Sequence, residues 1–210
     1  MFNKLMSSLG LQGIQVDTRL HTTAPQAGQA IQGEVIFKGA ASNKIINGIY
    51  LKLMTTAEVE SDDAEYNSAL SIAEWHISGA FELQAHQSHA FPFSIQLPFE
   101  TPVTDVPCRI NKTRVWLHTH LDVGWGLDAT DKDYLQIFPT PAMQAFIQAM
   151  QQCGFQLMTV DVEKVNYVAT ASTRALVVIK NLNLNLRNCS TASMKLKCPL
   201  WQSNIKPMCF

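Results

Sequence analysis

The sequence has few charged residues and no long apolar run. Of its 210 residues, 16% are charged and 47% are apolar, and the formal net charge is −1. The near-zero net charge gives no indication of the basic surface that nucleic-acid binding requires. The composition is typical of a folded chain rather than a disordered one. No apolar run approaches the ~18 residues of a membrane-spanning helix. The first ten residues also lack the apolar stretch and cleavage site of an export signal, so we expect a cytoplasmic protein with no integral membrane segment.

Motifs that signal catalysis are missing as well. The five cysteines are an odd number without a CxxC pair, so neither a disulfide framework nor a zinc knuckle is predicted. The sequence contains no GxSxG, GxxxxGK[ST] or GxGxxG motif. A nucleophile elbow and a nucleotide-binding loop are therefore not indicated. We predict a protein that is not an enzyme and holds no cofactor.

Apolar and polar side chains alternate along most of the first 123 residues, as they do in half-buried β-strands. About seven such segments without long helices between them indicate a β-sandwich. The segments are residues 14–20, 30–37, 45–55, 70–77, 80–83, 89–97 and 113–122. Pro92 lies inside one of them and predicts an edge strand or a bulge, because proline cannot donate to a sheet ladder.

Two short helices are predicted outside this pattern. Thr140 suits the N-cap of the first, Pro141 its first position and Gly154 its end. Its apolar face consists of Met143, Phe146, Ile147 and Met150. The second is an apolar stripe over residues 2–9, which we expect to dock on the sandwich, with a membrane or partner anchor as the alternative.

Several separated segments, taken in order over roughly residues 1–168, resemble one protein family. They are Val16-Asp17-Thr18, Gly33-Glu-Val35, Ile49-Tyr-Leu51-Lys-Leu53-Met54-Thr55, Phe91-Pro-Phe93, Leu97-Pro98-Phe99-Glu100-Thr101-Pro102, Val115-Trp-Leu117-His118-Thr119, Leu121-Asp122 and Asp128-Ala-Thr130-Asp131-Lys132-Asp133-Tyr134. Together they resemble the bacterial sporulation-control family of the stage-zero M type, whose fold is arrestin-like. The resemblance implies a non-catalytic regulator or scaffold that binds protein partners, in bacteria that do or do not form spores. Homo-oligomers are also compatible with it.

The fold class implied by the resemblance is all-β, with two antiparallel β-sandwiches in tandem. We expect an N-terminal sandwich over residues 1–135, a linker strand and helix over 136–154, and a partial C-terminal sandwich over 155–210. The second sandwich is expected to be truncated or altered.

The family's pattern fails after about residue 171, where acidic strands are expected. All 17 acidic residues lie at or before Glu163, and seven Lys or Arg residues follow it. Codons can be chosen for segments 180–186 and 194–198 that encode family-like acidic strands when both are read in one shared alternative frame. We hypothesise a frameshift near residues 170–178, so that the chain is altered after about residue 170. A genuinely divergent basic tail is the alternative, and the nucleotide sequence decides between them.

The best metal candidate in the sequence is the group His118, His120 and Asp122. Alternate residues of a strand share one face, so two imidazoles and a carboxylate point the same way. This predicts a divalent-metal-binding protein or a metal-dependent hydrolase as the alternative function. The simpler interpretation is the exposed polar face of a strand, because a metal site needs three or four converging ligands.

Four aspartates form the second candidate group. Asp122, Asp128, Asp131 and Asp133 lie around Trp125. They lack the spacing of a calcium-binding loop, and we interpret them as a hydrogen-bonded turn and a polar joint between the two sandwiches. Pairing with Lys132 and Arg114 is expected there.

Two surfaces are predicted for partner binding by added strands. One is the strand that Pro92 interrupts, and the other is the acidic hairpin end around Ser61, Asp62, Asp63 and Glu65.

Overall fold

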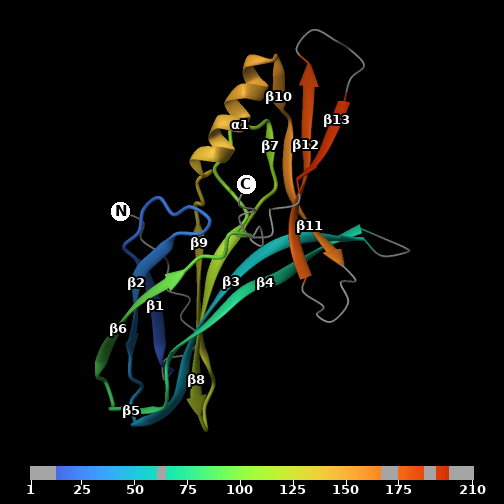
Figure 1. Cartoon of the computed structure of the whole chain (residues 1–210). Coiled ribbons are helices and arrows are strands. Elements are labelled where there is room, and N and C mark those ends of the chain that lie inside the picture. Colours follow the sequence, from blue (N-terminus) through green and yellow to red (C-terminus); the bar gives the residue numbers. More distant parts are fainter. Residues whose placement is uncertain (1–12, 61–64, 167–174, 187–192, 199–210) are drawn as a thin grey trace, which may run out of the picture.

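The computed structural model describes residues 13–60, 65–166, 175–186 and 193–198. Within these residues the chain is mostly β-strand with one α-helix, as predicted (Figure 1). A three-stranded sheet has the order β1-β2-β6 and consists of β1 (Gln15–Leu20), β2 (Ala30–Lys38) and β6 (Ser88–Gln96).

The remaining described strands belong to a larger sheet, with the path β10-β12-β11-β3-β8-β9 and four strands beside it. These strands are β3 (Lys44–Glu60), β4 (Glu65–Ser78), β5 (Phe81–Leu83), β7 (Ile110–Asn111), β8 (Val115–Gly124), β9 (Ala129–Leu135), β10 (Phe155–Leu157), β11 (Thr159–Asn166), β12 (Ala175–Leu186) and β13 (Ser193–Cys198). The helix α1 (Pro141–Gln152) connects β9 to β10.

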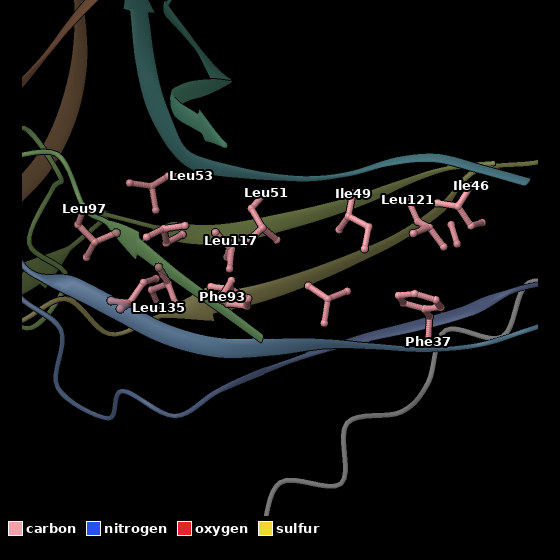
Figure 2. Packing of buried hydrophobic residues seen from close by; sticks show 14 of the residues in the cluster. Phe37, Ile46, Ile49, Leu51, Leu53, Phe93, Leu97, Leu117, Leu121 and Leu135 are labelled. Carbon is pink, nitrogen blue, oxygen red and sulfur yellow. The ribbon is translucent and has the colours of Figure 1, made fainter. Parts of the chain in front are cut away.

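The main core lies between the three-stranded sheet and the β3–β8–β9 part of the larger sheet. Figure 2 shows apolar side chains from both layers filling this space. Leu51, Leu53, Leu117 and Leu121 are fully buried there, and Phe37 faces them from β2. Every second residue of these strands points inward, which is the two-residue alternation read from the sequence.

Gly33 of β2 has no room for a side chain between β1 and β6. A Cβ atom at this position would lie 2.4 Å from the carbonyl oxygen of Arg19 and 2.7 Å from the ring of Phe93. Any larger residue would therefore force the backbone apart. Glycine within a strand is otherwise unfavourable, and the lack of space for a side chain explains why it occupies this position.

Strand β3 continues beyond the main core. It pairs with β8 from Ile45 to Thr55, and further along Glu58 pairs in parallel with Glu163 of β11. Figure 1 shows β3 and β4 curving together towards β11. A second, small buried cluster forms there around Ala57 and Val162.

The helix has the predicted ends. The Thr140 hydroxyl oxygen accepts a hydrogen bond from the Met143 amide at 3.3 Å, Pro141 occupies the first helical position, and Gly154 has a φ of +87°. None of the helix residues is buried, and Phe146 is 44% exposed. In the described part of the chain, no helix has the length and apolar character needed to cross a bilayer.

Two predicted features lie wholly or largely outside the described residues. The apolar stripe over residues 2–9 is one of them. The other is the acidic hairpin end, of which residues 61–63 are not described and Glu65 is the first residue of β4. The altered tail is described only in part: residues 175–186 form β12, which pairs antiparallel with β11. The frameshift stays a hypothesis.

Candidate functional site

His118, His120 and Asp122 do share one face of β8. They alternate with buried neighbours and point away from the core. His118 lies opposite Lys52 and Lys132 in the register of the sheet.

His120 and Asp122 each interact with a different polar side chain. His120 Nε2 is 3.6 Å from a carboxylate oxygen of Asp128, and Asp122 accepts a hydrogen bond of 2.9 Å from the Asn47 amide. In the described residues no three His, Cys, Asp or Glu side chains are grouped so as to hold a metal ion. The metal-dependent interpretation therefore finds no ligand set in this part of the chain.

The four aspartates do not form one cluster. Asp122 and Asp128 lie on the outer side at the turn of the β8–β9 hairpin, where Asp128 Oδ1 accepts from the Val123 amide at 2.9 Å. Asp131 and Asp133 pair with Thr119 and Leu117, so they lie on the core-facing side. The turn is at the end of the hairpin remote from Leu135 and the connection to α1.

The expected cationic partners have other contacts. Arg114 Nη1 donates to the carbonyl oxygens of Thr113 and Asn111, at 3.0 and 3.4 Å. The Lys132 ammonium lies over the rings of Trp116 and Tyr134, 4.1 and 4.7 Å from their centroids. Neither contact is the predicted pairing with a carboxylate.

A polar contact between the two sheets was not predicted from the sequence. The hydroxyls of Thr18 in β1 and Thr119 in β8 are 2.6 Å apart, and both residues are buried. Asp131 Oδ2 accepts a hydrogen bond of 2.8 Å from the Thr18 amide. The sequence signal was a polar residue at an inward-facing position of each strand, which indicates a hydrogen bond inside the core.

Three cationic or titratable side chains form a row across the outer face of the sheet. In this row, called the Lys–His–Lys row below, Lys52 of β3 and Lys132 of β9 flank His118 of β8. Burial lowers the pKa of His118 most, and the charges of His120, Lys52 and Lys132 lower it further, whereas a hydrogen bond with the Asp131 backbone raises it. Lys52 also pairs with Glu74 of β4 at 3.3 Å.

The lowered pKa of His118 predicts a loss of stability in mild acid. The unfolded chain takes up this proton near the ordinary pKa of 6.5, whereas folded His118 takes it up at lower pH. The free energy of unfolding therefore falls as the pH drops from 6.5 through the interval down to the folded pKa, and is unaffected well above 6.5. We expect His118→Gln to reduce the difference between urea unfolding curves recorded at pH 7.5 and pH 5.5.

His21→Gln, at an exposed position beside the other sheet, is the control for this measurement and is expected to keep the wild-type loss. An unchanged pH dependence in His118→Gln would contradict the assignment.

Strand β6 has a free edge within the described residues, as Pro92 predicted, because β2 is its partner there. Hydrogen bonds at both ends of the pair show which residues face β2: the Leu97 amide donates to Gln29 and the Gln87 carbonyl accepts from Gly39. Bonding direction alternates along an antiparallel strand. The backbone N–H and C=O groups of the odd-numbered residues of β6 therefore point to β2, and those of the even-numbered residues point to the free edge.

Pro92 is one of the outward-facing residues, so its missing N–H costs no bond to β2. It divides the free edge into two short stretches of donors. These donors are the amides of Ser88, Ala90, Ser94 and Gln96.

Comparison with known proteins gives consistent results. The family model described as SpoOM protein matches residues 2–179, and the match ends within β12. The sporulation-control protein spo0M of Bacillus subtilis (strain 168) is 32% identical over 166 residues, which are 79% of this chain and 62% of that protein.

A solved structure is also similar. The crystal structure of Spo0M, a sporulation control protein from Bacillus subtilis, has a TM-score of 0.71 and 30% identity to this chain. The similarity covers 80% of this chain and 65% of that chain, so this chain spans less than two thirds of both relatives.

Proposed function

The chain belongs to the SpoOM protein family, and from this membership we propose that it is a non-catalytic regulatory or scaffold protein of the sporulation-control type, which acts by binding other proteins. The observation that carries the binding mode is the free edge of β6. An exposed strand edge presents unpaired backbone donors and acceptors, to which an extended segment of another protein can add as a further strand.

The edge is built for selective rather than general pairing. Its outward amides at Ser88 and Ala90 are separated from those at Ser94 and Gln96 by Pro92. A partner strand finds no donor opposite Pro92, so long uniform strands pair poorly with this edge. A segment that fits must leave its own acceptor unpaired at that point or bend away from it.

We also propose the division into a sandwich over residues 1–135, a linker over 136–154 and a partial second sandwich over 155–210. The distribution of the core supports it, because the main cluster draws nearly all of its residues from the first range. We place the protein in the cytoplasm on the same family basis. An arrestin-like relationship of the two sandwiches is part of this proposal.

Ser94→Pro is expected to abolish partner binding through this edge. The substitution removes one outward N–H, and it leaves the bonds between β2 and β6 intact because residue 94 faces away from β2. Ser94→Ala keeps the N–H and is the matched control. The measurement is quantitative affinity capture from native lysate with wild type, Ser94→Ala and Ser94→Pro side by side.

Proteins retained by wild type and Ser94→Ala but lost with Ser94→Pro support binding at this edge. Equal retention by all three, with equal melting temperatures, excludes the β6 edge as the site. If wild type retains nothing above empty resin, the binding function itself fails.

A further inference from the structure

The Lys–His–Lys row places like charges next to one another when His118 is protonated. Neighbouring strands are about 4.8 Å apart, so directly opposed side chains are in close proximity. Lys52 faces His118, and His118 faces Lys132 in the adjacent strand. Like charges in opposed positions are destabilising, so their repulsion in the row lowers the stability of the folded protein.

The described carboxylates leave His118 without an anionic neighbour on its own face. Glu74 contacts Lys52 from the far side of that lysine, at 3.3 Å. Asp128 is near His120 at 3.6 Å. The Asp131 carboxylate lies on the opposite face of the sheet, where one oxygen accepts a hydrogen bond from the Thr18 amide, and only the Asp131 backbone forms a hydrogen bond with His118.

The contacts of Lys132 hold it in place without neutralising it. Its ammonium lies over Trp116 and Tyr134, and aromatic rings attract a cation while leaving it its full charge. Lys52 is paired with Glu74 in a partly exposed ion pair, with exposed side-chain fractions of 36% and 48%. Such pairs contribute about 0–1 kcal/mol, so a stronger anion can displace Glu74.

From this geometry we propose that the Lys–His–Lys row binds a phosphate dianion. A phosphate monoester offers three acceptor oxygens and a charge of about −1.5 to −2 at neutral pH. These match two ammonium groups with the imidazole of His118 between them, arranged across three strands. A carboxylate has only two oxygens and a single charge, so it balances less of the positive charge of the two lysines.

Free phosphate and a phosphate ester on another molecule share this chemistry. Lys132 is exposed and Lys52 is half-buried, so the row is open to either. Binding of the dianion favours protonated His118, and protonation of His118 in turn favours binding, because the two equilibria are linked.

The test is an NMR titration of the whole chain with labelled histidine at pH 6.5. Inorganic phosphate and O-phosphoserine are added in separate arms, against sodium chloride at equal ionic strength. We expect a saturable displacement of the His118 ring resonances in both phosphate arms and none with chloride, together with a rise in the pKa of His118 of about one unit. The affinity of each ligand is referred to the concentration of its dianion. Tighter binding of O-phosphoserine on this scale identifies an esterified phosphate as the ligand, and equal binding identifies the free ion.

Variants assign the effect to the row. Lys132→Gln is expected to weaken binding about tenfold or more, since hydrogen bonds between charged groups are the strong ones. Lys132→Arg keeps the charge and the stacking and is expected to retain binding. Lys38→Gln, in the other sheet, is the matched control and is expected to bind as wild type does.

Absence of a saturable shift at His118, or equal losses in Lys132→Gln and Lys38→Gln, overturns the proposal. If Lys132→Gln lowers the melting temperature, the comparison of wild type with Lys132→Arg still decides, because a site that depends on charge survives that exchange.

Discussion

Replacing Leu117 by alanine is expected to lower the free energy of unfolding by about 3 kcal/mol. Leu117 is fully buried in β8, between β3 and β9 of the larger sheet, and faces the three-stranded sheet across the core. The smaller side chain removes apolar contacts and leaves a cavity, since strands on both sides prevent the site from closing. The measurement is equilibrium unfolding in urea, monitored by tryptophan fluorescence.

Leu127→Ala is the matched control, because it is the same exchange in the same hairpin. Leu127 is 94% exposed at the turn, so we expect a change within about 0.5 kcal/mol. Similar losses in both variants would contradict the position of β8 in the core.

The second large effect is expected from the contact between the hydroxyls of Thr18 and Thr119. Thr119→Val leaves the Thr18 hydroxyl buried without its partner, 2.6 Å away in the native protein, and should cost about 1–3 kcal/mol. Thr18→Val is expected to act in the same way. The double variant should regain most of the loss, because an apolar pair of the same shape is close to neutral.

A double-mutant cycle measures this coupling directly. Melting temperatures of the wild type, both single variants and the double variant are sufficient. Strictly additive losses would show that the two hydroxyls are satisfied independently, and would remove this contact as a link between the sheets.

The sequence predicted those strands whose inward and outward positions differ clearly in polarity. In β8, for example, buried Leu117 and Leu121 alternate with His118 and His120. Strand β9 was not predicted, because Asp131 and Asp133 occupy its inward positions and hide the period. The predicted third strand ended at Thr55, whereas β3 continues to Glu60 through pairing with β4. Such pairing depends on distant residues and has no local signal.

The same limit applies to the candidate site. Alternation predicted that His118, His120 and Asp122 share a face, and this is confirmed. It did not predict Lys52 and Lys132 beside His118, because the register between strands is fixed by the turns and the packing of the whole sheet. Pro92 did predict an edge strand, since a missing N–H is a property of the residue itself.

The long strand β3 has a mechanical consequence. Its 17 residues, Lys44–Glu60, have an extended length of about 56 Å, and the strand runs from the main core past Glu58 beside β11. A strand of this kind can bend and twist, but it cannot lengthen because its backbone is already extended. Because one continuous strand pairs with β8 in the main core and with β11 at Glu58, we expect a displacement of β11 to be felt first in the end of β3 that extends beyond the core.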